Sequence, residues 1–384
     1  MQAYFIKTKK QHDILQKLDT LHTAFRSRES ELNVLNSYPL ENILALKAMG
    51  YTTLTLPTEY GGDAISLYDF VLFQEKLGQL SAPTALAIGW HLGIVKDIAT
   101  QPNWQDPALL ADFFTQIKQG KLTNRAASEF ATGSPTRGGL PTTTAQLSAD
   151  GANYILTGEK SYTTLAPMLD YFLVTATLSG EICEFLVPKT TEGVSIVPGS
   201  WNSMSMRGTA SQILKLDRVA LPKNHLTVNR TLAKKSGHDN GWLLHIPACY
   251  LGLAQAALDE AILFAKSHTP NSLNAPLITL PTIVSKLGEI ALELTTARHF
   301  LYSICEKYDA GLSVATELGA VKHVVTNAAV SAVDHAMRIV GAKSLTEDSY
   351  LWQLYTNVRA GLHNPPMDDV VVTAMGQQAI NAVH

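Results

Sequence analysis

Few residues in this chain of 384 have the types and spacing that nucleophilic or metal-assisted chemistry needs. The twelve histidines include no pair four residues apart, and no Cys and His residues are spaced like zinc ligands. There is no Gly-x-Ser-x-Gly elbow, no phosphate-binding P-loop and no Gly-x-Gly-x-x-Gly fingerprint. The adjacent carboxylates Asp368 and Asp369 offer a different chemistry, because a buried aspartate can have its pKa raised into the range of a general base. Either residue can instead cap the helix that we predict from Val370 to Ala382.

Three segments rich in Ser and Thr lie among short runs of strand-forming residues. They are Ala126–Ser134, Thr157–Thr164 and Met206–Ser211. Each of them alone is typical of a turn. The runs 171–176, 184–187 and 194–197, separated by Gly, Ser and Pro, predict a small β-barrel or sandwich around these segments.

Helical patterns flank this β-rich part on both sides. Before it, Asp106-Pro107 begins a capped helix. After it, apolar residues recur at steps of three and four from Ile283 to Leu294 and from Val314 to Ala332, which predicts an antiparallel helical bundle. The predicted fold class is therefore α+β, with a helical domain at 1–121, a β domain at 122–226 and a helical bundle at 227–384.

The motifs resemble those of the acyl-CoA dehydrogenase family. Ala127-Ser128-Glu129 followed by Gly133-Ser134 resembles the Thr-Glu-Pro…Gly-Ser signature of that family, and 157–164 resembles its Asn-Gly-x-Lys-x-(aromatic)-x-Thr strand. The segment 206–211, followed by Val-Ala-Leu-Pro at 219–222, resembles the segment that closes the family's β domain. Further similarities lie at 57–62 and 250–258, so the resemblance spans roughly residues 50 to 380.

The resemblance implies an FAD cofactor. On this basis Ala127 and Ser128 meet the pyrimidine edge of the flavin, Tyr162 stacks along the ring, and Thr164 reaches the region of N5. Ser134 would line the acyl-thioester side. Hydrogen-bond donors are needed at these edges because negative charge collects there when the flavin is reduced.

The sequence also departs from the family at two kinds of position. The Arg that holds the FAD pyrophosphate in the family is missing from the matching stretch 267–272. Arg338, much later in the chain, either supplies the cation from another direction or is a surface residue at a helix end. The catalytic Glu of the family falls on Pro365, and the family's alternative position falls near Trp242, where no carboxylate stands. Asp368 and Asp369 are then the remaining candidates for the base, which leaves the acyl-site chemistry open.

We therefore carry three hypotheses about function. The first is dehydrogenation of an acyl thioester, carried by CoA or an acyl-carrier protein, with electrons passed to an electron-accepting flavoprotein. The second is a flavin-dependent monooxygenase or oxidase of the same fold, which needs no α-proton base. The third is a non-enzymatic flavin- or acyl-binding protein.

Composition restricts the partners and the setting. A net charge of −3 offers no electrostatic basis for nucleic-acid binding. Three scattered cysteines predict free thiols and a cytoplasmic location, and no apolar run suggests a membrane span. The apolar stripes between 277 and 342 predict a homo-oligomer, either a dimer or a tetramer.

Overall fold

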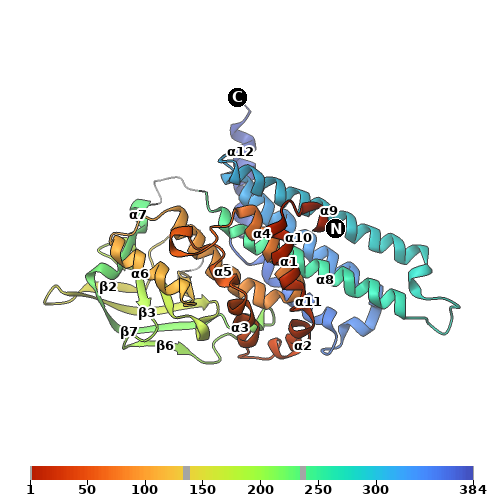
Figure 1. Ribbon diagram of the computed structural model, residues 1–384, viewed down its shortest axis with the longest axis horizontal. Coiled ribbons are helices and arrows are strands. Elements are labelled where there is room, and N and C mark those ends of the chain that lie inside the picture. The colour runs from red at the N-terminus through yellow and green to blue at the C-terminus, as the bar shows by residue number, and fades with distance from the viewer. Residues whose placement is uncertain (1, 133–138, 234–238, 384) are drawn as a thin grey trace.

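A computed structural model describes residues 2–132, 139–233 and 239–383 of the chain (Figure 1). The β-rich part lies at one end of the elongated molecule, the long C-terminal helices lie at the other, and the N-terminal helices lie between them. The helices are α1 (Lys9–Asp19), α2 (His22–Leu32), α3 (Leu40–Ala48), α4 (Leu67–Leu80), α5 (Ala82–Thr100), α6 (Pro107–Lys118), α7 (Arg230–Ala233), α8 (His245–Ser267), α9 (Pro281–Asp309), α10 (Ala315–Val340), α11 (Tyr350–Val358) and α12 (Asp368–Asn381). The predicted α+β class, with helical parts on either side of a β domain, is confirmed.

The strands form one sheet, and most of its pairs are antiparallel. Their bounds are β1 (Thr123–Ala126), β2 (Thr144–Leu147), β3 (Asn153–Thr163), β4 (Tyr171–Leu178), β5 (Glu181–Pro188), β6 (Val194–Val197), β7 (Gln212–Pro222) and β8 (Leu226–Asn229). The order is β6-β7-β3-β2-β4-β5-β8, and β1 pairs in parallel with β4. Among the described strands, β6 and β8 therefore stand at opposite ends of the pairing order. A closed barrel would instead pair these two strands with each other. Because β1 begins at Thr123 and β8 ends at Asn229, these strands lie near the two domain boundaries proposed from the sequence.

Local sequence explains several element boundaries. The side chain of Asp106 accepts hydrogen bonds from the amides of Ala108 and Leu109, so the predicted cap of α6 is confirmed. Ser66 caps α4 in the same way through the amide of Asp69. The final helix begins two residues earlier than predicted.

The core is continuous through the helical part, and α8 lies at its centre. Helices α4 and α8 cross closely because each has a glycine at the crossing: a Cβ at Gly252 would stand 2.0 Å from the carbonyl oxygen of Glu75. The Glu75 carboxylate accepts hydrogen bonds from Arg298 at 2.8 Å and from the Tyr302 hydroxyl at 2.7 Å, which ties α9 to α4. These side chains are almost fully buried, so the bundle encloses a satisfied polar network.

One helix, spanning Gly241–Ser267, is long and apolar enough to cross a membrane, which the sequence analysis did not anticipate. Two-thirds of its apolar window is buried inside the fold, as in the core helix of a helical bundle. The three cysteines, Cys183, Cys249 and Cys305, are free, as predicted, and all three are buried.

Candidate functional site

A chain of hydroxyl groups lies where β3 ends. The Thr164 hydroxyl is 2.9 Å from the Ser211 hydroxyl, which is 2.8 Å from the Thr209 hydroxyl. The Leu165 amide donates to the carbonyl of Thr209 at 2.8 Å, so the turn after β3 is held against the start of β7. The segments 157–164 and 206–211, which the sequence analysis singled out separately, are therefore side by side.

The backbone around these hydroxyls has an unusual conformation. Four of the non-glycine residues with positive φ lie here: Tyr162 (55°), Leu165 (63°), Met206 (53°) and Ala210 (42°). Such residues are uncommon, and they collect at functional sites where the surrounding structure holds them in place. We therefore take this strip, from Tyr162 to Leu165 and from Met206 to Ser211, as the candidate site and call it the hydroxyl strip.

An exposed aromatic patch borders the hydroxyl strip. The rings of Phe130 and Tyr162 are 5.3 Å apart and nearly perpendicular, and both side chains are more than half exposed. Tyr162 also meets Trp201 at 6.0 Å, and the Trp201 indole donates to the Met206 carbonyl at 3.0 Å. Met204 is exposed beside them in the sequence. An exposed aromatic patch next to a line of hydroxyl groups suits a planar ring system with polar edges, such as a flavin.

A buried ion pair positions the loop that carries Ser128. The Ser128 carbonyl accepts from the Ser161 amide at 2.8 Å, and next to it the Glu129 carboxylate accepts from Lys160 Nζ at 2.6 Å. The same carboxylate accepts from the amides of Thr142 and Thr143 at 2.6 and 3.0 Å. Burial opposes ionisation, but these hydrogen bonds outweigh it and lower the pKa of Glu129 to about 2. The first sequence motif is thus anchored to the second.

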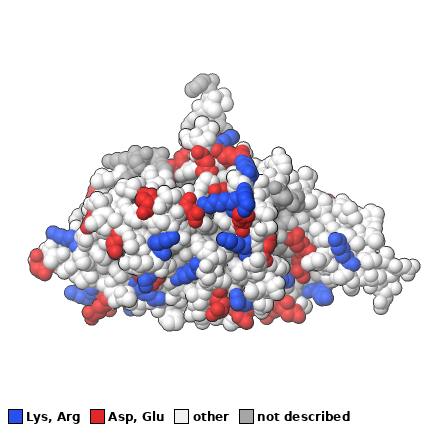
Figure 2. Space-filling model, in the orientation of Figure 1, with Lys and Arg blue, Asp and Glu red and all other residues white. Residues whose placement is uncertain are grey.

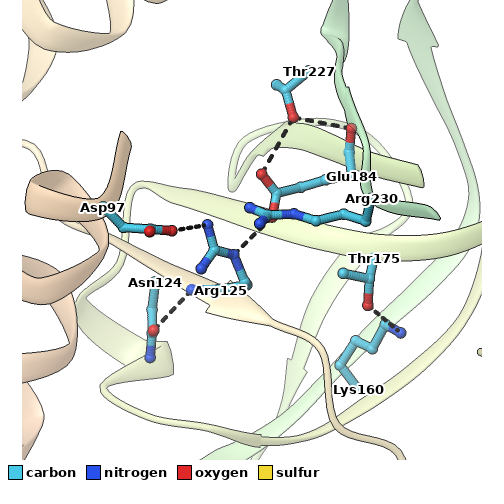
Figure 3. A network of polar contacts seen from close by, with 8 residues as sticks. All are labelled: Asp97, Asn124, Arg125, Lys160, Thr175, Glu184, Thr227 and Arg230. Carbon is cyan, nitrogen blue, oxygen red and sulfur yellow. Dashed lines mark hydrogen bonds and ion pairs between the residues drawn. The ribbon is translucent and has the colours of Figure 1, made fainter. Parts of the chain in front are cut away.

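A second polar network holds β1 against α5 (Figure 3). Arg125 on β1 donates to Asp97 on α5 at 3.0 Å and to Glu184 on β5 at 2.7 Å, and Arg230 reaches the same Glu184 oxygen at 2.6 Å. Although burial opposes ionisation, Arg125 and Arg230 lower the pKa of Glu184. Since β1 leads directly into Ala127 and Ser128, this network fixes the approach of the chain to the site.

The C-terminal bundle meets the β domain at the hydroxyl strip. The Met206 amide donates to Asn357 Oδ1 at 2.7 Å, and the Ala360 amide donates to the Ser205 hydroxyl at 3.1 Å. Farther along the chain, the Tyr250 hydroxyl donates to Asn364 Oδ1 at 2.6 Å. The sequence analysis did not single out Asn357 or Ser205, because nothing in their local sequence indicates a contact across 150 residues.

Asp368, at the start of α12, forms an ion pair with Lys322 of α10. Its carboxylate lies 3.1 Å from Lys322 Nζ and 3.0 Å from the Asn327 amide nitrogen. Burial acts to raise the pKa of Asp368, but these two contacts outweigh it and the pKa is lowered, so the expected rise is wrong. The expected cap is also wrong, because the N-cap of α12 is Met367 and no side chain caps it. Asp368 stands in the first helical turn, where its charge favours the helix dipole, and Asp369 beside it is exposed.

The other predicted site residues lie in different surroundings. Ser134 falls outside the described residues. Ala127 and Ser128 are half-buried after β1, and Thr164 is buried in the hydroxyl strip. Arg338 is exposed in the last turn of α10.

Charges over the visible face are mixed in sign, and α12 projects from the molecule with few charges (Figure 2). Among the described residues, no group of three or more His, Cys, Asp or Glu side chains is arranged to hold a metal ion. The candidate site therefore consists of the hydroxyl strip, the aromatic patch and the C-terminal segment docked beside them.

Three stretches of the chain match models of acyl-CoA dehydrogenase domains: the N-terminal domain at 16–101, the middle domain at 124–219 and the C-terminal domain at 244–362. The chain belongs to the acyl-CoA dehydrogenase family, and it is accordingly a flavoprotein oxidoreductase with FAD as cofactor.

Relatives of this chain cover almost its full length. The putative acyl-CoA dehydrogenase YdbM of Bacillus subtilis (strain 168) is 45% identical over 99% of this chain and 100% of its own length. A 3-(aryl)acrylate reductase of Clostridium sporogenes (strain ATCC 15579) is 26% identical over 91% of this chain and 93% of its own. Butyryl-CoA dehydrogenase from Megasphaera elsdenii has the same fold, with a TM-score of 0.87 at 20% identity over 98% of this chain and 99% of that one.

Proposed function

We propose that the protein oxidises the α,β carbon–carbon bond of an acyl thioester at the hydroxyl strip. The observation that supports this proposal is the meeting of three features: the Thr164–Ser211–Thr209 hydroxyls, the exposed patch around Tyr162, and the C-terminal segment docked at Met206. Bound FAD supplies the acceptor for the hydride that leaves the β-carbon.

The residues around the site are suited to hold a flavin. We propose that Ala127 and Ser128 bind the pyrimidine edge, because the Glu129–Lys160 pair holds their loop in place. Tyr162 would offer its exposed ring to the flavin plane, and Thr164 would offer its hydroxyl close to N5. Arg338, exposed at the end of α10, is the proposed contact for the pyrophosphate, and Ser134 is the proposed contact on the acyl-thioester side.

We propose Asp368, ahead of the exposed Asp369, as the base that takes the α-proton. Its lowered pKa keeps it in the carboxylate form that a base requires. The same contacts reduce its affinity for a proton, so a role as the base requires substrate binding to separate the carboxylate from Lys322. Movement of the first turn of α12 away from α10 would achieve this separation.

We further propose that an electron-transferring flavoprotein reoxidises the cofactor and that the protein is a homo-oligomer. Relatives in this family interact with electron transfer flavoproteins, which supports the first proposal. Exposed apolar side chains on α12, namely Val372, Met375 and Ile380, support the second, because water contact with such a surface is unfavourable and a second subunit would remove it.

Anaerobic titration of the purified holoprotein with a panel of acyl thioesters, monitored through the flavin absorbance, tests the proposed function. At least one thioester should bleach the flavin and yield the α,β-unsaturated product. Bleaching by none of them would contradict the proposal and favour a binding protein. Oxygen uptake coupled to an oxygenated product, with no unsaturated thioester formed, would favour the monooxygenase alternative.

A further inference from the structure

Three aromatic side chains from different elements form a cluster at the start of the C-terminal bundle. Trp90 lies on α5, Trp242 lies in the short helix Gly241–Leu244, and His245 begins α8. The His245 ring is 5.0 Å from the Trp90 ring and 6.2 Å from the Trp242 ring, to which it is nearly parallel. We call Trp90, Trp242 and His245 the aromatic cluster.

Two glycines on α5 make room for the aromatic cluster. A Cβ at Gly89 would stand 2.5 Å from His245 Nδ1, and a Cβ at Gly93 would stand 2.6 Å from Trp242 Cε3. These glycines are four residues apart and therefore lie on one face of α5. The rings of Trp242 and His245 consequently fill space that any side chain at positions 89 and 93 would occupy.

Three nitrogens of this cluster have no hydrogen-bond partner among the described residues. Both ring nitrogens of His245 and the indole nitrogen of Trp242 are buried and unpaired. Burial without a compensating partner lowers the pKa of His245 to about 3, so the ring is neutral, with one donor and one acceptor nitrogen. Unpaired buried polar groups are rare in native proteins because each costs free energy, so three in one cluster require an explanation.

The neighbouring buried histidine on α5 shows the usual arrangement. His91 Nε2 is 3.0 Å from the Thr52 carbonyl oxygen, and its Nδ1 accepts from the Thr123 amide at 3.2 Å. Both of its nitrogens are therefore paired within the fold. His245 differs from His91 in lacking any such partner, although both rings are fully buried.

The aromatic cluster adjoins the proposed flavin site. Helix α5 contacts β1, which leads into Ala127 and Ser128, and it also contacts the turn Arg207–Thr209 of the hydroxyl strip. The Arg125 guanidinium on β1 lies 6.0 Å from the Trp242 ring centroid. Trp90 is only partly buried, whereas Trp242 and His245 are buried.

We infer that the aromatic cluster recognises the acyl group and that the substrate is an aryl-acyl thioester whose ring bears a hydroxyl group. The inference rests on the proposed function and assigns its substrate class. A planar ring packs against Trp90 and Trp242, and a phenolic hydroxyl both donates and accepts, as the unpaired nitrogens of His245 and Trp242 require. A long straight acyl chain has neither a planar ring for these side chains nor a polar group to pair with their nitrogens.

The experiment compares three thioesters of CoA on the wild-type holoprotein: 3-(4-hydroxyphenyl)propionyl, 3-phenylpropionyl and octanoyl. Binding is measured anaerobically from the shift in flavin absorbance with the corresponding unsaturated products, and reaction is measured from flavin bleaching. The hydroxyphenyl compound should bind about tenfold more tightly than the phenyl compound, which corresponds to one additional hydrogen bond. Octanoyl should bind most weakly.

Variants then assign this preference to the cluster. His245→Phe keeps a planar ring and should abolish the tenfold advantage of the hydroxyl group, while the melting temperature of the apoprotein stays the same or rises because two unpaired nitrogens are removed. His91→Phe is the matched control: it should lower the melting temperature, because two hydrogen bonds are lost, and leave the preference among thioesters unchanged.

Each outcome bears on the inference. Equal or tighter binding of octanoyl by the wild type, or an unchanged hydroxyl preference in His245→Phe, overturns it while leaving the proposed function intact, provided that octanoyl bleaches the flavin. A melting temperature that falls as far in His245→Phe as in His91→Phe also overturns it, because the His245 nitrogens would then have partners in the native protein. If no thioester binds or bleaches the flavin, the proposed function fails and the inference fails with it.

Discussion

Replacement of Glu129 by Gln tests whether the buried ion pair holds the flavin loop. Gln has nearly the same shape but carries no charge, and it places an amide group where one carboxylate oxygen now accepts hydrogen bonds. Lys160, which is fully buried, would lose its counter-ion, and its other hydrogen-bond partner among the described residues is the Thr175 hydroxyl at 3.3 Å. Glu129 also binds two backbone amides, so the change disturbs the loop on both sides.

The expected loss of stability is large. Removal of one partner from a buried ion pair typically costs about 3–5 kcal/mol, because the remaining charge is uncompensated. Thr175 offers partial compensation, so we expect about 3 kcal/mol for Glu129→Gln. The double variant Glu129→Gln with Lys160→Met removes both charges and should be less destabilised than Glu129→Gln alone.

Urea unfolding of the apoprotein measures this loss without a contribution from bound cofactor. FAD affinity, measured by quenching of flavin fluorescence, should fall in Glu129→Gln, because the Ser128 loop is released. A loss of stability below about 1 kcal/mol, the range of an exposed ion pair, would refute the reasoning. Equal destabilisation in the single and double variants would show that the unpaired Lys160 is not the cause.

The same ion pair predicts that the free energy of unfolding depends on pH. The pKa of Glu129 is about 2 in the folded protein, against an ordinary value of 4.5. A lowered folded-state pKa contributes stability that is present above the unfolded value and is lost as pH falls towards the folded value. The difference in unfolding free energy between wild type and Glu129→Gln should therefore shrink between about pH 5 and pH 2.

Three further predictions concern the base, the hydroxyl strip and the subunits. Asp368→Asn should slow flavin reduction by an acyl thioester by about a hundredfold, and the exposed neighbour Asp369→Asn is the matched control; a wild-type rate in Asp368→Asn removes that residue from the reaction. Thr164→Val keeps the shape of the side chain and breaks the hydroxyl chain at Ser211, so it should weaken FAD binding about tenfold in a fluorescence titration, whereas unchanged affinity would contradict a cofactor role. Sedimentation at micromolar concentration should give a homo-oligomer, and replacement of Val372 and Met375 by charged residues should shift the protein towards the monomer. A stable wild-type monomer would refute this proposal.

Local patterns determined much of the architecture. Runs of strand-forming residues located β4, β5 and β6, and apolar stripes located α9 and α10, because these patterns favour the element whatever its partner is. The Asp106 cap was predictable for the same reason, since a helix start is satisfied by residues beside it in the chain. The family could be predicted because its motifs are recognised by their residues and by their order along the chain, both of which the sequence contains.

The tertiary structure decided which of these residues meet. Positive φ at Tyr162, Leu165, Met206 and Ala210 brings two distant motifs into one hydroxyl strip, and no local pattern in these residue types predicts that conformation. Asp368, two residues before the predicted helix start at Val370, has the sequence position of a helix cap. Its partner is instead Lys322 on another helix, so its pKa falls where a rise was expected.

His91 and His245 show most clearly what the tertiary structure decides and the local sequence does not. In the sequence both are histidines in apolar stretches, and no local pattern distinguishes them. Only the fold shows that His91 finds its partners on neighbouring segments, whereas His245 is buried against Trp90 and Trp242 with no partner among the described residues. Hydrogen-bond satisfaction depends on groups supplied by other parts of the chain, and the sequence determines their positions only through the complete packing of α5, β1 and α8.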